Sequence, residues 1–322
     1  MGITRIFFLF PGQGAQYPGM GLDLLPASPA ARAVFDTASE VLGFDMAGLI
    51  RNADGEALRR TGVSQPALAA VSLAAAACLG EKGVVPAACA GFSLGEYPAL
   101  ACAGVIGPED CFRLTGARGR AMQDAVDRMA AAGRDRPGMS AVLGLDSGKV
   151  EALIAQWKDA AGSVLGDLYA ANINSSKQVV VSGPAAALAE AERRFREAGA
   201  RRCVRLRVDG PFHSPLMKPA AEAFAPVLEG VCFKDPAIPF FSNVTGGEIR
   251  TGTEAKALAL RQIVEGVRWT QEEAALAEKA PEAVAEAGPG RVLQGLWQET
   301  GSAVPCYGAG TLEDIGKVKE LV

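Results

Sequence analysis

The chain has 322 residues, of which 49% are hydrophobic and 21% charged, so it can bury a large core in one large domain or two smaller ones. Its net charge of −4 argues against nucleic acid as the main partner. The N-terminal apolar run at 6–10 is far shorter than the roughly 20 residues of a membrane span, and too short for a signal peptide.

The seven cysteines are odd in number and show no CxxC or other metal-ligand spacing. Most of them lie among Ala, Leu and Val, which is typical of small buried thiols in a reducing compartment. We therefore expect a cytoplasmic protein that neither contacts a membrane nor binds a metal.

The first part of the chain predicts alternating strands and helices. Residues 5–10 predict a buried strand that ends at the glycine-rich loop 11–20. The apolar run at 84–90 predicts a second strand, which leads directly into Gly91-Phe-Ser-Leu-Gly95. Helical patterns lie at 30–42, 65–79, 96–103, 108–115 and 117–131, and the one at 65–79 is nearly all alanine and leucine.

The middle of the chain has a different order of elements. Strand patterns lie at 139–145, 168–173, 178–182 and 203–208, and helical patterns at 147–160, with Ser147 as its cap, and at 185–198. The order β-α-β-β-α-β is that of the ferredoxin-like unit. We predict a small subdomain at 137–208, inserted in a larger α/β domain made of 1–136 and 209–322.

The remainder belongs to the larger domain. A strand pattern at 239–243 and a short stretch at 282–286 alternate with helical patterns at 219–230, 254–265, 270–279 and 291–299. A tail follows, and the chain has no repeats.

Ser93 lies in a Gly-x-Ser-x-Gly pattern between a predicted strand and a predicted helix. That context is typical of a nucleophile elbow, where small flanking residues allow a sharp turn that exposes the serine. The pattern is short, however, and a chain with 38 glycines can contain it by chance as an ordinary turn. A serine hydroxyl also needs a base before it becomes a good nucleophile.

His213 is the only histidine of the chain, so it is the only imidazole that could activate Ser93. It lies between Pro211 and Pro215, in a loop after a predicted strand. A lone histidine is more often a bystander, and the residue that would orient its ring cannot be read from the sequence.

The loop Gly12-Gln-Gly-Ala-Gln16 looks at first like a phosphate-binding loop. It lacks GK[ST], and Tyr17 occupies the last glycine position of G-x-G-x-x-G, so both nucleotide interpretations are weak. The alternative is a turn that brings a glutamine and backbone N–H groups close to a reacting centre.

Taken together, these motifs resemble the malonyl-CoA:acyl carrier protein transacylases and the related acyltransferase domains of polyketide synthases. The similarity covers nearly the whole chain, in the order Pro11-Gly-Gln-Gly-Ala-Gln16, Gly91-Phe-Ser-Leu-Gly-Glu96, Arg118-Gly-Arg-Ala-Met-Gln123, Asn172-Ile-Asn174, Gly210-Pro-Phe-His-Ser-Pro-Leu-Met217, Arg261-Gln262, Trp269-Thr270 and Gly288-Pro-Gly290. It implies a large α/β-hydrolase-like domain with a parallel sheet and a nucleophile elbow, plus an inserted ferredoxin-like small subdomain.

The resemblance also implies roles for individual residues. Ser93 would carry the acyl group as an ester, and His213 would be its base. The backbone carbonyl of Gln262 would orient the imidazole, and the backbone N–H groups of Gln13 and Leu94 would form the oxyanion hole.

The same resemblance makes Arg118 the residue that binds the free carboxylate of malonate. A planar guanidinium can pair with both carboxylate oxygens, whereas an acetyl group offers it nothing. Without the family, an arginine on a helix would be interpreted as a solvated surface charge.

The acyl pocket would include Phe92, Met122 and Phe212. The family usually has His where this chain has Phe92, which leaves substrate preference and local packing open. Phe212 matches members that accept unbranched malonyl, because a bulky ring would clash with an α-methyl group.

A basic cluster, Arg201, Arg202, Arg205 and Arg207, lies near the end of the predicted insert. Arg201 and Arg202 match positions that are proposed to meet the acidic carrier protein in the family. An ordinary solvated strand edge is the alternative.

The resulting hypothesis is a monomeric S-malonyltransferase that moves malonyl from malonyl-CoA to acyl carrier protein through a malonyl-serine. It needs no metal or bound cofactor, because CoA and phosphopantetheine enter as parts of the substrates. A trans-acting polyketide acyltransferase, an editing acyl hydrolase with the same dyad and a catalytically silent carrier-binding scaffold are the alternatives. We expect a role in fatty acid synthesis, because the chain has little beyond the family core, although the sequence itself does not say which kind of carrier is served.

Overall fold

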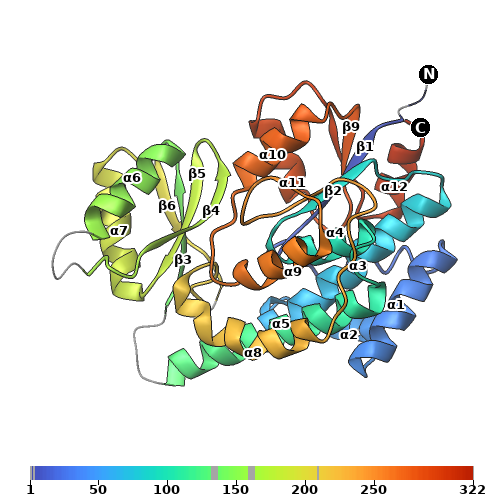
Figure 1. The fold of residues 1–322 in the computed structure, drawn as a ribbon, viewed down its shortest axis with the longest axis horizontal. Helices are drawn as coiled ribbons and strands as arrows, with labels where there is room; N and C mark the ends of the chain where they lie inside the picture. Colours follow the sequence, from blue (N-terminus) through green and yellow to red (C-terminus); the bar gives the residue numbers. More distant parts are fainter. Residues whose placement is uncertain (1, 3, 132–136, 159–163, 209, 322) are drawn as a thin grey trace.

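The computed structural model describes residues 2, 4–131, 137–158, 164–208 and 210–321. They form two separate sheets, which lie towards opposite ends of the molecule (Figure 1). The larger sheet has the order β10 (Cys306–Gly308), β9 (Ala283–Glu286), β1 (Ile6–Phe10), β2 (Ala88–Gly91), β7 (Phe240–Phe241) and β8 (Glu248–Ile249). The smaller one has the order β4 (Tyr169–Ser175), β5 (Gln178–Gly183), β3 (Gly138–Leu143) and β6 (Arg202–Arg205).

The larger sheet is parallel from β10 to β7, and only β8 pairs antiparallel with its neighbour. Its central strand β1 is apolar throughout because both of its faces are covered. Phe7 and Leu9 face one core, while Ile6, Phe8 and Phe10 face the other. The continuous apolar run at the start of the chain is therefore a fully buried parallel strand, as predicted.

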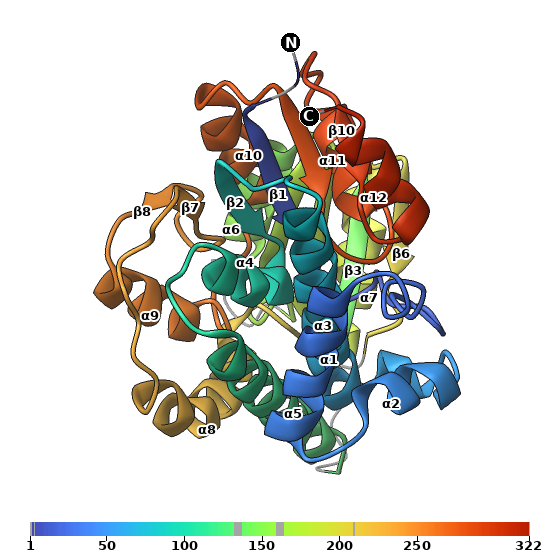
Figure 2. The same ribbon diagram turned by 90° about the vertical axis from the view of Figure 1, so that its right-hand side faces the viewer.

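Helices cover both faces of this sheet. The core on the Phe8 side includes residues of α1 (Pro29–Leu42), α3 (Thr61–Glu81), α4 (Glu96–Cys102) and α5 (Pro108–Ala131), of which α1 and α3 are seen together in Figure 2. The core on the Leu9 side includes residues of α10 (Trp269–Glu278) and α11 (Val292–Glu299). Further helices are α2 (Met46–Asn52), α8 (Lys218–Glu229), α9 (Gly252–Arg261) and α12 (Leu312–Lys319).

Helix α3 is long and apolar enough to cross a membrane, judged by length and composition. However, 78% of its most apolar window is buried inside the protein. It packs against α1 and α5 as the central helix of the core, which accounts for its alanine-rich sequence.

The small sheet is antiparallel, and α6 (Ser147–Lys158) and α7 (Ala185–Glu197) contribute with it to a core of its own. Its elements follow the predicted β-α-β-β-α-β order, so the predicted fold class is confirmed. The two predicted junctions, at 136/137 and 208/209, involve residues outside the described ranges, and the domain boundaries stay predictions. The predicted end of α6 at 160 also lies outside them.

Several local predictions were wrong. The cap of α6 is Asp146 rather than Ser147, because Asp146 Oδ1 accepts the backbone N–H of Lys149 at 3.1 Å. The helices predicted at 108–115 and 117–131 are one helix, α5. Gly116 does not interrupt it but gives room to α1, since a Cβ at that position would lie 2.7 Å from Leu42 Cδ2. Helices α2 and α12 and strands β8 and β10 were not predicted.

The two-sided burial of β1 gives a stability prediction. Leu9→Ala should lower the free energy of unfolding by about 2–5 kcal/mol, because it leaves a cavity at a side chain that is 0% exposed. Val85→Ala, at a side chain that is 67% exposed, should change it by less than about 0.5 kcal/mol. Denaturant titration of both variants measures the difference, and equal effects would contradict the burial of Leu9.

Candidate functional site

A sharp turn between β2 and α4 presents Ser93. Its backbone is left-handed, with φ of 52°, an uncommon conformation for a residue other than glycine. The flanking glycines are sterically required. A Cβ at Gly91 would lie 1.9 Å from the Gly95 carbonyl oxygen, and a Cβ at Gly95 would lie 1.9 Å from that of Phe10. The Gly-x-Ser-x-Gly pattern is therefore a strained elbow in which the strand and the helix nearly touch.

The structure brings His213 to this elbow across 120 positions of sequence. Its Nε2 lies 2.7 Å from Ser93 Oγ. Its Nδ1 lies 2.8 Å from the backbone oxygen of Gln262 and 3.3 Å from that of Glu265. Since carbonyls only accept hydrogen bonds, Nδ1 carries the proton and Nε2 is free to accept the one from Ser93. The ring is thus oriented by backbone, without a carboxylate.

The electrostatics keep this imidazole neutral. Burial is the main cause and the positive charge of Arg118 the second, and together they lower the pKa of His213 to about 4. The two backbone carbonyls oppose this shift, but less strongly. A neutral ring at physiological pH is the form that can act as a base.

Arg118 is a buried cation, not the solvated charge that a helix position alone would suggest. It is 1% exposed, and its Nη2 donates to the side-chain Oε1 of Gln262 at 3.0 Å. Its guanidinium carbon lies 5.6 Å from the ring centre of Tyr97. Within the described residues its Nε has no hydrogen-bond partner, and burial lowers the pKa of its guanidinium. A buried charge without an ion-pair partner favours an anionic ligand.

These groups share one cavity of about 170 Å³. It lies where α5 of the large domain meets β4 and β5 of the small sheet, and Val292 and Leu296 of α11 also line it. The lining includes the predicted residues Gln13, Phe92, Ser93, Leu94, Arg118, Met122, Phe212 and His213, together with Gln65, Asn172, Asn174, Leu206 and Val208.

The predicted oxyanion-hole residues are both in this lining. Leu94 follows Ser93 in the short 3-10 turn Ser93–Gly95 that precedes α4, and the first backbone N–H groups of such a turn have no partner within it. In the described part of the chain, neither its N–H nor that of Gln13 donates to a protein acceptor. The side chain of Gln13 is engaged elsewhere, with Nε2 3.4 Å from the Arg59 carbonyl oxygen.

Phe92, Met122 and Phe212, which were predicted to form an acyl pocket, are apolar residues of the cavity lining. The Phe92 ring packs edge-on against Trp269, with ring centres 5.3 Å apart, so the position that usually holds His is used here for packing. Phe212 is 5% exposed. Met122 Sδ accepts a hydrogen bond from Gln65 Nε2 at 3.3 Å. Gln65 was not predicted as a site residue.

Arg201 and Arg202 lie outside the cavity. Both are exposed at the start of the edge strand β6. Arg205, on the same strand, pairs with Glu192 at 3.0 Å, which leaves less of its charge free for a partner.

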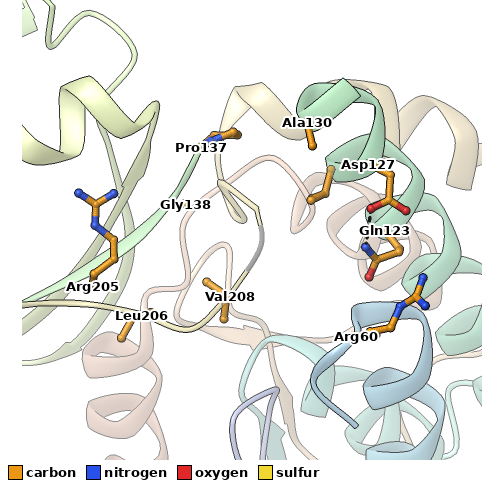
Figure 3. A pocket seen from close by; sticks show the side chains of 10 residues that line it. Arg60, Gln123, Asp127, Ala130, Pro137, Gly138, Arg205, Leu206 and Val208 are labelled. Carbon is orange, nitrogen blue, oxygen red and sulfur yellow. Dashed lines mark hydrogen bonds between the residues drawn. The ribbon is translucent and has the colours of Figure 1, made fainter. Parts of the chain in front are cut away.

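A second groove, of about 400 Å³, adjoins the cavity (Figure 3). Leu206 and Val208 line both. Figure 3 shows Arg60 on the helical side of this groove and Arg205 on the opposite side. The groove thus has a cation on each of two opposite sides, and it meets the Ser93 cavity at Leu206 and Val208.

Sequence reasoning missed the polar network behind the elbow. Asn243 is fully buried and bonds to Ser93, Gln262 and Glu272, while Glu96 accepts from its backbone N–H. In the sequence Asn243 is the last residue of the strand predicted at 239–243, whereas the observed strand β7 ends at Phe241, and no local pattern indicates that Asn243 reaches Ser93.

Comparison with known proteins agrees with this geometry. The acyl transferase domain family matches residues 7–318. The malonyl CoA-acyl carrier protein transacylase of Haemophilus influenzae is 40% identical over 297 residues, 91% of each chain. The solved transacylase of Coxiella burnetii is 31% identical, with a TM-score of 0.91 over 99% of this chain and 98% of that one.

A malonyl-transacylase solved in complex with a type II polyketide acyl-carrier protein is 35% identical, with a TM-score of 0.90 over 98% of this chain and 99% of that one. The agreement covers nearly the full length in sequence and in fold. The chain belongs to the acyl transferase domain family and, within it, to the malonyl-CoA–acyl carrier protein transacylases.

Proposed function

We propose that this protein transfers the malonyl group from malonyl-CoA to the phosphopantetheine thiol of an acyl carrier protein, in the cytoplasm and for fatty acid synthesis. One observation carries the proposal: the Ser93–His213 pair opens into the same small cavity as Arg118, a buried cation whose Nε has no hydrogen-bond partner among the described residues. A nucleophile and base would serve any acyl transfer. The buried cation selects an acyl group that ends in a carboxylate.

In the first half-reaction, Ser93 Oγ attacks the thioester carbonyl as its proton passes to His213 Nε2. The carbonyl oxygen becomes an oxyanion, which the N–H groups of Leu94 and Gln13 stabilise. The C–S bond then breaks, and the CoA thiolate takes the proton from His213. The backbone carbonyls of Gln262 and Glu265 stabilise the transient imidazolium through Nδ1–H.

The second half-reaction reverses these steps with a different thiol. His213 takes the proton of the phosphopantetheine thiol, and the sulfur attacks the malonyl ester of Ser93. The C–O bond breaks, and Ser93 recovers a proton from His213. No metal or bound cofactor takes part in this scheme.

The groove in Figure 3 is a suitable path for the pantetheine arm, which both substrates share. It meets the cavity at Leu206 and Val208, and Arg60 and Arg205 lie where a phosphate could be bound. Arg201 and Arg202, exposed near its β6 side, are suited to an acidic carrier protein.

A carrier of polyketide synthesis is a second candidate acceptor. The structure of a relative with a type II polyketide carrier protein favours it. The chemistry at Ser93 is the same for both carriers, so a comparison of KM for the two purified carriers decides between them.

Arg118→Ala tests the proposed carboxylate recognition. Malonyl transfer should lose about 2–5 kcal/mol of transition-state stabilisation, at least about 30-fold in kcat/KM, because the bound carboxylate becomes a buried unpaired charge. Transfer of acetyl from acetyl-CoA should be unchanged or faster. Arg120→Ala, at an exposed position on the same helix, is the matched control. Equal losses for both acyl groups would show that Arg118 is only structural.

The pKa of His213 predicts the pH profile of the first half-reaction. A base with a pKa of about 4 stays neutral as the pH falls through 6.5, so acylation of Ser93 should keep its rate down to about pH 5 and lose it below. Stopped-flow release of CoA from pH 4 to 8 measures this. A midpoint near 6.5 would contradict the proposed environment of the ring.

Glu96 is the other nearby group that titrates in this range, since burial raises its pKa to about 7. Its opposite charge also acts on Arg118. Glu96→Gln removes this titration. An inflection of the acylation rate near pH 7 that vanishes in the variant therefore belongs to Glu96, whereas the loss of rate near pH 4, which belongs to His213, should persist.

Carrier docking predicts a selective kinetic effect. Arg201→Glu with Arg202→Glu should raise KM for the carrier about tenfold, because the acidic partner is repelled, and leave KM for malonyl-CoA unchanged. Arg32→Glu with Arg51→Glu, at exposed positions on α1 and α2, makes the same change in net charge elsewhere. An unchanged carrier KM, or equal effects of the two pairs, would refute the docking surface.

A further inference from the structure

Asn243 lies behind the nucleophile elbow, just after β7, and is 0% exposed. Its side-chain Oδ1 accepts the backbone N–H of Ser93 at 2.6 Å and Nε2 of Gln262 at 3.2 Å. Its Nδ2 donates to the Gly91 carbonyl oxygen at 2.7 Å and to Glu272 Oε2 at 2.8 Å. One amide therefore contacts both the last residue of β2 and the nucleophile itself.

The orientation of this amide is determined by its neighbours. Oδ1 faces two donors and Nδ2 faces two acceptors, so a rotation by 180° would place like groups against each other at all four contacts. The backbone of Asn243 is fixed as well, because its N–H donates to Glu96 Oε2 at 2.8 Å. The amide is thus a rigid element anchored by α4 and α10, and its oxygen points at Ser93.

Both polar groups of the Ser93 backbone are held in this way. The N–H is held by Asn243, and the carbonyl oxygen accepts from Gln262 Nε2 at 2.9 Å. A left-handed backbone at a residue with a side chain costs about 1–3 kcal/mol and persists only where its surroundings impose it. Two side-chain amides from distant segments impose it here.

This backbone conformation also decides which donors face the substrate. With its own N–H directed at Asn243, Ser93 cannot donate to an oxyanion, and the next N–H, that of Leu94, remains for that task. Loss of the Asn243 oxygen would leave a buried N–H unpaired, at a cost of about 1–3 kcal/mol. The elbow would relax, and Oγ would move from its position 2.7 Å from His213.

We infer that Asn243 is a positioning residue for acyl transfer, whose side-chain oxygen holds the Ser93 N–H and thereby aims Ser93 Oγ at His213. The inference rests on the proposed function only in naming malonyl-CoA as the acyl donor. The arrangement of Ser93 that it describes applies to any electrophile that reacts with this serine.

The test compares Asn243→Ala, which lacks the oxygen, with Asn243→Asp, which keeps an oxygen that can accept from the Ser93 N–H and, in its protonated form, an O–H that can donate to Glu272 in place of Nδ2. Phe240→Leu, on the neighbouring β7, is the control for loss of packing without loss of the amide. Each full-length variant is assayed for single-turnover acylation by malonyl-CoA, for KM, for labelling of Ser93 by a fluorophosphonate probe and for Tm.

We expect Asn243→Ala to lower the acylation rate and the probe-labelling rate at least about 100-fold, a loss of about 2.7 kcal/mol, with KM changed less than about threefold. Both rates of Asn243→Asp should be at least about tenfold higher than those of Asn243→Ala. Phe240→Leu should lower Tm while keeping both rates within about threefold. Rates that fall only in proportion to the unfolded fraction, or equal rates for the Ala and Asp variants, would overturn the inference.

The probe separates this inference from the proposed function. If the unmodified protein reacts with the fluorophosphonate but not with malonyl-CoA, the proposed substrate is wrong, and the probe rates of the variants still decide the role of Asn243. If the unmodified protein reacts with malonyl-CoA and Asn243→Ala does so equally fast, the inference alone is refuted.

Discussion

The hydrogen bond between Ser93 and His213 is the interaction on which the site depends, and much of the fold serves to impose it. Both residues have left-handed backbones, with φ of 52° and 55°, and each is held by partners far away in the sequence. Gln262 links the two halves, since its backbone oxygen orients the imidazole while its side chain holds the carbonyl of the serine. The strain of the elbow is therefore offset by the large domain, not by the loop itself.

A second constraint is the buried positive charge of Arg118 beside the cavity. Arg118 contacts the side chains of Gln262 and Tyr97, and burial lowers the pKa of its guanidinium. Such a site is costly for the empty protein and favourable for a ligand that brings its own carboxylate. The same charge helps to keep His213 neutral. In the proposed function, recognition of the acyl group and activation of the nucleophile therefore share one electrostatic origin, and the small volume and the buried Phe212 ring would restrict the acyl group further.

The sequence predicted well what local patterns encode. The apolar run of β1, the elbow glycines and the β-α-β-β-α-β order each have a local physical cause, and the motif set singled out Ser93, His213 and Arg118, which the structure brings together. Local patterns could not predict the features that depend on contacts between segments far apart in the sequence. Asn243 looks like the end of a strand until β7 is placed beside β2, and Gly116 looks like a helix end until α1 packs on it. The C-terminal tail that forms β10 and α12 carries weak local signals.

Intact-protein mass spectrometry after brief mixing with equal amounts of malonyl-CoA and acetyl-CoA tests the central claim most directly. The account predicts one added malonyl group per chain, little acetyl, a malonyl ester mapped to Ser93 by peptide analysis, and none in Ser93→Ala. The ester should disappear when a carrier protein with its phosphopantetheine is added. An acetyl adduct in excess over malonyl, or a malonyl adduct that persists in Ser93→Ala, would contradict it.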